Sequence, residues 1–400
     1  MTGDTTALTD YFKRNYDVGS PLFAAQQNLK AASWSRFKPG SIKPSPQGVF
    51  IPVMMRGNES VRAYNETEGN VDPQDPLPVQ ATILTKEIRA NFELTGRSIA
   101  LSKTDSVAFA YTLDATMKDT LFRLMSSCNR QVLGTGTGQI TLVDGAVVAS
   151  TSIVVDNPFL LRANMYIDAW TAVGGTKEAS RVKITNINFS TRTITVDTAV
   201  TLTDNDLIVM SGVLDNAPTE GKEISGLQRI CDTTTLGTSF EGISASTYSE
   251  WQGNVIDAGA VPVSQDLLQR IANRVSWVGD SSPDLLMSAY GQARNFLNTE
   301  LNKVRYEPAK VEGGHTVLKW NDLTWMIEKD YPLNEVGMYN TEYIERMQID
   351  EPRLASYTGN QLYQKTGFNA IAGYYIWYGN LFTRKRNAHG RLINLTEPTF

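Results

Sequence analysis

The chain has 400 residues, of which 41% are hydrophobic and 20% are charged, and its formal net charge at pH 7 is −5. This composition excludes a disordered or fibrous chain and allows a large buried core, in one elaborate domain or in several. Positive and negative side chains are interspersed, so composition shows no basic face of the kind that a sequence-specific DNA-binding protein carries.

The first part of the chain favours extended structure. Residues 1–45 are polar and show no sustained period, which indicates an N-terminal arm. Within residues 46–95, an apolar run leads to a tip at 64–78 whose three prolines and four acidic residues forbid regular structure. The chain then returns with the period of a half-buried strand, in which Ile88, Ala90, Phe92 and Leu94 alternate with polar residues. We therefore expect a projecting β-hairpin with an acidic tip.

The next segment, residues 96–139, contains a long amphipathic pattern. Thr104 or Asp105 can cap its start and Gly134 can end it. A helix over 105–132 would be about 40 Å long at 1.5 Å per residue. Its apolar stripe recurs at spacings of three and four, at Leu113, Met117, Leu121, Leu124, Cys128 and Val132.

Residues 140–215 differ in composition, because Thr, Val, Ile, Asn and Asp dominate short alternating segments such as 181–185 and 193–196. They predict a small β-rich module inserted in a larger fold. In residues 216–365 α and β patterns alternate, with a helix capped by Ser264, strands at 284–288 and 323–327, and a helix at 289–301. Residues 366–400 contain an aromatic strand at 374–378. The predicted fold class is α+β.

No constellation of residues predicts catalysis, so we expect no catalytic, cofactor-binding or metal-binding residue. Neither His315 nor His389 has a Cys, His or carboxylate at ligand spacing. The glycines of 134–138 follow a helix, whereas a dinucleotide-binding loop follows a strand. The basic run 384–386 is typical of a solvated or inter-subunit cluster, with DNA contact as the alternative. Packing roles are expected for both cysteines and for Trp251, Trp320, Trp325 and Trp377.

The N-terminus does not have the pattern of a secretory signal, and no run of about 18 apolar residues occurs. We therefore expect a chain that is not exported and has no membrane partner. The only two cysteines are too few for a disulfide framework, which suits a reducing compartment.

The order of these elements resembles that of the major capsid proteins of tailed bacteriophages, whose fold is shared with herpesvirus shells. Asn129-Arg-Gln-Val-Leu-Gly-Thr-Gly-Thr-Gly138 is similar to the end of the family's spine helix, and Ile224-Ser-Gly-Leu227 is similar to the Gly-Leu segment that follows it. The segments 266–269 and 283–288 resemble the family's axial domain, and 378–393 resembles its closing peripheral strands. The resemblance covers roughly residues 80 to 400 without the module at 140–215.

The resemblance implies an N-terminal arm (1–45), an extended β-hairpin (46–95), a peripheral domain with the spine helix (96–139), a β-rich insertion domain (140–215), an axial domain (216–365) and peripheral C-terminal strands (366–400). It also implies a non-enzymatic subunit that self-assembles as hexamers and pentamers into an icosahedral head around double-stranded DNA, without sequence-specific binding. Scaffolding, portal and decoration proteins would be its partners. The location would be the virion, assembled in the host bacterial cytoplasm.

One departure from the family pattern concerns cross-linking. Some members join their subunits through a lysine near the hairpin tip, but residues 56–78 contain no lysine. We therefore expect a non-covalent shell. Two alternatives stay open at this point: an encapsulin-like nanocompartment shell with the same fold, and a β-rich carbohydrate-active enzyme, since two facing carboxylates are enough for glycoside hydrolysis.

Overall fold

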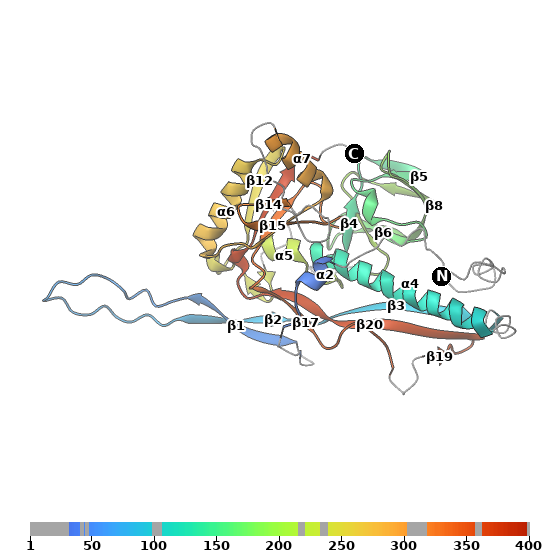
Figure 1. The fold of residues 1–400 in the computed structure, drawn as a ribbon, viewed down its shortest axis with the longest axis horizontal. Helices are drawn as coiled ribbons and strands as arrows, with labels where there is room; N and C mark the ends of the chain where they lie inside the picture. The colour runs from blue at the N-terminus through green and yellow to red at the C-terminus, as the bar shows by residue number, and fades with distance from the viewer. Residues whose placement is uncertain are drawn as a thin grey trace.

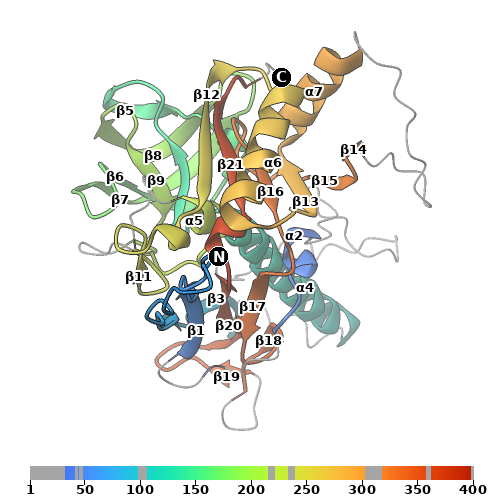
Figure 2. The same cartoon turned by 90° about the vertical axis from the view of Figure 1, so that its left-hand side faces the viewer.

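The structure is a computed structural model that describes residues 32–40, 44, 48–97, 106–214, 221–232, 239–301, 318–356 and 362–397. Most of the predicted arm, residues 1–31, and His315 lie outside these ranges. The described chain is rich in sheet and has few helices (Figure 1). Its strands form a long hairpin, a sheet beneath one long helix, a separate β module and a mixed sheet covered by two helices (Figures 1 and 2).

The hairpin consists of β1 (Val49–Arg56) and β2 (Leu77–Ile83), which pair antiparallel from Val49 opposite Ile83 to Arg56 opposite Leu77. The returning strand of the hairpin was predicted around Ile88, and this prediction is wrong. The alternating strand exists as β3 (Lys86–Thr95), but it pairs with β20 (Ala370–Thr383) and belongs to another sheet. Pro78 and a length of only seven residues hide the period of β2 in the sequence.

Helix α4 (Ser106–Leu133) matches the predicted long helix to within a residue at each end. The C-terminal half of its apolar stripe is buried, since Leu124, Cys128 and Val132 are at most 1% exposed, whereas Met117 and Leu121 are partly exposed. This stripe packs on a sheet whose longest strand is β20, with β3 on one side and β17 (Ile344–Gln348), β18 (Arg353–Leu354) and β19 (Tyr363–Gln364) on the other. The short helix α2 (Ala32–Arg36) packs against α4, and its Trp34 ring meets Trp377 of β20 edge to face.

Residues 139–210 form a separate six-stranded β module with its own core (Figure 1). The strand order is β4 (Gln139–Leu142), β9 (Leu207–Met210), β6 (Tyr166–Trp170), β7 (Lys177–Asn188), β8 (Thr193–Leu202) and β5 (Val147–Val154). A bridge between Val143 and Val155 joins the two outer strands, so the sheet closes on itself. Closure leaves few unpaired backbone groups at the edges. One 3-10 turn, η1 (Pro158–Leu160), follows β5.

The two ends of the module return to the same place. Ile224 donates its backbone N–H to Gln131 of α4 over 3.2 Å, and Gln228 donates to the carbonyl of Leu133 over 3.1 Å. Gly226 is required here, because a Cβ at this position would lie 2.3 Å from the carbonyl oxygen of Gly134. The predicted Gly-Thr-Gly and Gly-Leu segments are therefore adjacent in space although the module separates them in sequence.

After the module come α5 (Leu227–Cys231), β10 (Ser239–Phe240), β11 (Ile243–Ser244) and η2 (Ser249–Trp251). A six-stranded sheet follows, in the order β12 (Asn254–Val261), β21 (Gly390–Leu395), β16 (Val336–Tyr339), β13 (Leu285–Ser288), β15 (Leu323–Ile327) and β14 (Leu318–Trp320). Helices α6 (Gln265–Gly279) and α7 (Tyr290–Leu301) share one core with this sheet, while Leu285 and Met287 join the core beneath α4. Ser264 caps α6 as predicted.

Two strands cross the predicted domain boundaries. β21 belongs to the sheet of residues 254–395, although it was predicted to lie with the peripheral strands, and β17 lies beside β20 although it was predicted in the axial domain. The predicted packing roles are confirmed, because Trp251, Trp320, Trp325 and Trp377 are at most 4% exposed and both cysteines are buried. The predicted axial and peripheral domains are therefore not separate units in the described ranges, because each contributes a strand to the sheet of the other.

Candidate assembly surfaces

Within the described ranges there is no group of three or more His, Cys, Asp or Glu side chains that could hold a metal ion. Burial raises the pKa of the Cys128 and Cys231 thiols to about 12, so neither is a ready nucleophile at neutral pH. No described helix is long and apolar enough to cross a membrane. The distinctive features of the described residues are exposed apolar and acidic surfaces and a cluster of buried charged side chains.

His389 is a buried structural residue. Its Nδ1 accepts the backbone N–H of Asn340 over 3.3 Å, which leaves Nε2 to donate to Thr383 Oγ1 over 2.9 Å. Burial lowers the pKa of the imidazole to about 3. The ring is therefore neutral in the folded state at physiological pH.

We expect the His389 ring resonances to stay unchanged from about pH 8 to about pH 4, because the folded-state pKa lies below this range. The free energy of unfolding should decrease as pH falls from about 6.5 towards about 3, because in this range His389 binds a proton in the unfolded chain but not in the folded one. Histidine-selective carbon labelling, with a His315→Gln variant for assignment, measures this directly. A His389 signal that titrates near its ordinary pKa would contradict the assignment.

The hairpin presents two different faces. Val49, Ile51, Val53 and Met55 of β1 are buried at 4–9% exposure in the core that includes Trp251. The opposite face exposes Phe50 at 46% and Met54 at 62%, with Pro52 between them and Pro78 paired with Met54. Exposed apolar side chains that lie side by side on a two-stranded ribbon mark an interaction surface.

Beyond this ribbon the tip is exposed and acidic. Between residues 56 and 80 no side chain is buried. The tip segment 57–76 has five carboxylates and one arginine, and Arg62 lies 3.9 Å from Glu68. In Figure 1 the hairpin extends away from the rest of the subunit, so the tip is available to another molecule.

Met54 and Met55 offer a matched test of the two faces. Met54→Asp should leave the unfolding free energy within about 0.5 kcal/mol and weaken self-association, because Met54 is exposed. Met55→Asp should cost about 3 kcal/mol or more, because it places a carboxylate in the core. Denaturant unfolding and light scattering measure the two effects. Equal loss of stability in both variants would contradict the assigned faces.

A second exposed surface lies on α6. Trp277 is 93% exposed, and it continues a stripe with Arg270 and Arg274 at helical spacing on the outer side of the helix. The inner side holds Leu267, Leu268, Ile271 and Val275. A fully exposed tryptophan beside arginines has the composition of an interface anchor.

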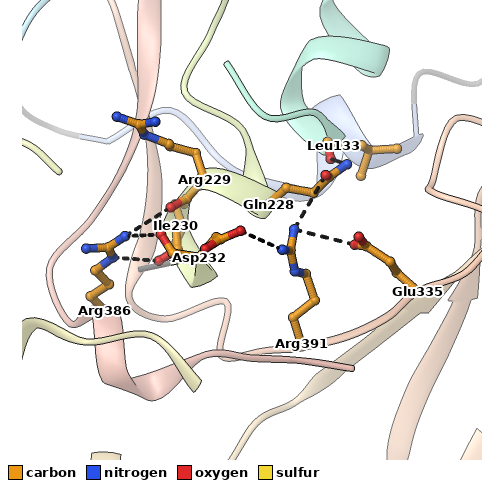
Figure 3. Close-up of polar contacts among 8 residues, drawn as sticks. All are labelled: Leu133, Gln228, Arg229, Ile230, Asp232, Glu335, Arg386 and Arg391. Atoms are coloured by element: carbon orange, nitrogen blue, oxygen red, sulfur yellow. Dashed lines mark hydrogen bonds and ion pairs between the residues drawn. The ribbon is translucent and has the colours of Figure 1, made fainter. Parts of the chain in front are cut away.

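The chain also holds a buried cluster of charges around α5 (Figure 3). Arg386 is 0% exposed and donates to the carbonyl oxygens of Ile230, Arg229 and Asp232 at 2.8, 3.3 and 2.6 Å. A fourth bond reaches the carbonyl of Trp251 over 3.3 Å. The carbonyls of Arg229, Ile230 and Asp232 lie at the C-terminal end of α5, so the guanidinium of Arg386 caps this end of the helix. The expectation of a solvated basic run at 384–386 is therefore wrong for Arg386.

Arg391 joins the same cluster from β21 (Figure 3). Its guanidinium lies 3.0 Å from Asp232 and 3.5 Å from Glu335, and both its side chain and that of Asp232 are at most 5% exposed. Burial raises the pKa of Glu335, and the charge of Arg391 opposes that rise. Sequence reasoning missed this cluster, since its members are far apart in the chain and no local pattern distinguishes a buried arginine from a solvated one.

No family model and no curated protein sequence matches the chain. Solved structures do. A chain of the cyanophage A-1(L) capsid asymmetric unit gives a TM-score of 0.60 at 8% identity, covering 95% of this chain and 97% of that chain. The capsid of a native GTA particle gives 0.51 at 8% identity, covering 98% and 99%. The SrpI encapsulin of Synechococcus elongatus PCC 7942 gives 0.50 at 9% identity, covering 98% and 95%.

These similarities extend over almost the whole chain, so they concern the complete arrangement of hairpin, long helix and sheets and not one common motif. Because the sequence identities are below 10%, these structural similarities establish the fold alone. The chain therefore has the fold of phage capsid proteins, as the order of its sequence elements predicts, and this is a fold that the encapsulin shell shares.

Proposed function

We propose that this chain is the major capsid protein of a tailed phage, a structural subunit that assembles as hexamers and pentamers into an icosahedral head around double-stranded DNA. The observation that carries the proposal is the hairpin, whose apolar face and acidic tip are exposed and are not covered by the described part of its own subunit. On a chain with a capsid fold, the natural partner of such a surface is another copy of the chain.

The finer architecture is part of this proposal. We assign α4 as the spine helix and residues 140–215 as an insertion domain, since both ends of the module return to α4. Residues 96–139 and 366–400 would form the peripheral domain, residues 216–365 the axial domain, and residues 1–45 an arm that contacts other subunits. β21 and β17 make the two domains share strands.

The proposed location is the virion, with assembly in the host bacterial cytoplasm. Scaffolding, portal and decoration proteins are the proposed partners, and contact with DNA would be independent of its sequence. The shell would be non-covalent, because the tip segment 57–76 has no lysine to form a cross-link with a neighbour. The proteins with which the chain shares its fold are structural, which supports a subunit without catalysis.

An encapsulin-like shell that encloses protein is the second candidate, favoured by the similarity to SrpI. The higher TM-score of the cyanophage capsid, 0.60 against 0.50, favours the first. Expression of the chain alone, followed by size-exclusion chromatography and negative-stain microscopy, separates the outcomes. Capsomers or large empty shells support the capsid proposal; small closed shells that retain protein cargo support the encapsulin, and a permanent monomer would refute both.

A further inference from the structure

The outer face of α6 exposes both positive charge and apolar area. Arg270, Arg274 and Trp277 follow one another at spacings of four and three residues, so they lie on one stripe of the helix. Trp277 is 93% exposed, and its neighbour Val278 is 51% exposed. These four residues, called the α6 face below, combine the two side-chain types that most often anchor a protein interface, tryptophan and arginine.

The arginines of the α6 face differ from other exposed arginines of the chain. Several of those already lie beside a carboxylate of their own subunit, at 2.9 to 3.7 Å, among them Arg36, Arg56, Arg353 and Arg384. Within the described ranges no ion pair joins Arg270 or Arg274 to a carboxylate. Asp266 lies one turn before Arg270, in the first turn of α6, where the helix dipole favours a negative charge. The two guanidinium groups are therefore available to a carboxylate from another molecule.

The tip segment 57–76 has the complementary composition. With one arginine and five carboxylates, its net charge is 1 − 5 = −4. Glu68 lies 3.9 Å from Arg62, but in the part of the chain that the structure describes no cation pairs with the other four, Glu59, Glu66, Asp72 and Asp75. Val61, in the same segment, is 90% exposed. The tip therefore offers what the α6 face lacks, negative charge next to an apolar side chain.

Hydrogen bonds across the tip hold it in one shape before it meets a partner. Asn58 Oδ1 accepts the backbone N–H of Gln74 over 3.4 Å, and the Tyr64 hydroxyl accepts the backbone N–H of Val71 over 2.9 Å. The guanidinium of Arg62 lies 4.8 Å from the centre of the Tyr64 ring. A loop that is already ordered loses less conformational entropy when it docks.

We propose that the α6 face is the docking site for the acidic hairpin tip of a second copy of the chain. Arg270 and Arg274 pair with tip carboxylates, and Trp277 packs on apolar tip side chains such as Val61. Figure 1 shows the hairpin pointing away from α6 of its own subunit, so the contact joins two copies. The inference rests on the proposed function, because it names the surface that receives the hairpin within the shell.

The docking contact is head-to-tail, since the tip of one copy meets a different surface on the next. Contacts of this kind close into rings, as capsomers require. Every copy supplies one tip and one α6 face, so the two surfaces are always present in equal numbers. Complementary charge gives such a contact its specificity, and like charge placed across it is strongly unfavourable.

Charge reversal on each side of the contact tests the proposal in the full chain. The double variant Arg270→Glu with Arg274→Glu should lower the particle yield roughly tenfold or more, because it places negative charge against the acidic tip. A tip variant with Glu59→Lys, Glu66→Lys, Asp72→Lys and Asp75→Lys should do the same. The chain that carries both sets should recover most of the yield. Sedimentation measures the yield, and denaturant unfolding checks that each variant folds.

The matched control is Lys319→Glu with Arg353→Glu, which changes the net charge by the same amount at two exposed positions away from the α6 face. It should assemble as the wild type does. If the control loses as much yield as the α6 variant, net charge and not docking explains the loss, and the proposal fails.

Cross-linking locates the contact directly. Ala63→Cys in the tip and Asn273→Cys on α6 introduce two exposed thiols, whereas both native cysteines are buried. In assembled protein a short bismaleimide should link the double variant into ladders on a denaturing gel, and neither single variant should form them.

Particles without these links, or an α6 reversal that assembles as the wild type does, would overturn the docking site and leave the capsid proposal intact. Normal assembly with a loss of DNA binding would assign the α6 face to nucleic acid and also overturn it. A wild type that never assembles would instead contradict the proposed function itself.

Discussion

Replacing residues 57–76 with the dipeptide Asn-Gly is expected to give a soluble, folded subunit that forms no stable shells. The replacement joins Arg56 to Leu77, which are paired in the hairpin, through a turn that suits two antiparallel strands. No side chain of the removed segment is buried, so the unfolding free energy should change by less than about 1 kcal/mol. Under the proposed function the exposed tip contacts a neighbouring subunit, and the replacement removes those contacts.

A control of equal length separates the effect of the length of the tip segment from the effect of its side chains. Substituting the same segment with a Gly/Ser linker keeps the length and removes the five carboxylates and Arg62. If side-chain contacts at the tip hold neighbours together, this variant should also assemble poorly. Particle yield by sedimentation and stability by denaturant unfolding give both answers, and normal shells from the shortened hairpin would refute its intersubunit role.

The Arg391→Met substitution is expected to cost about 3–5 kcal/mol of unfolding free energy at pH 7, because it leaves Asp232 and Glu335 without their shared cation in a buried site. In the variant both carboxyls should have higher pKa values in the folded state. The cost should therefore be largest at neutral pH and become smaller as the carboxyls are protonated at lower pH.

Arg353 provides the matched control, since it pairs with Asp350 over 3.2 Å with its side chain 61% exposed. Arg353→Met should cost less than about 1 kcal/mol, because water screens an exposed ion pair. Denaturant unfolding of both variants in the shortened-hairpin subunit avoids interference from assembly. Equal costs for the two substitutions would show that the cluster around α5 does not support the fold.

Local patterns in the sequence predict many elements well. The stripe through Leu124, Cys128 and Val132 predicts α4 with its correct buried face, and Ser264 marks the start of α6. Each of these signals lies within a few turns of one helix, where spacing determines which side chains share a face. The order of the elements also predicts the capsid fold.

Pairing between distant segments is what the sequence does not reveal. The alternation at Ile88–Leu94 identifies a strand, but it does not show that the partner is β20 and not β1. The burial of Arg386 depends on α5 and Trp251. Local charge patterns look the same for solvated and buried ions, so only the assembled fold reveals the cluster around α5.

The most direct test of the shell proposal is a cryo-electron microscopy reconstruction of the particle that this chain forms. We expect closed icosahedral shells in which density for residues 49–83 lies across an adjacent subunit, with Phe50 and Met54 buried in that contact. Density for residues 139–210, the proposed insertion domain, should be visible as a separate module beside α4. A particle in which the hairpin contacts no other subunit, or a protein that stays monomeric under all assembly conditions, would contradict the proposal.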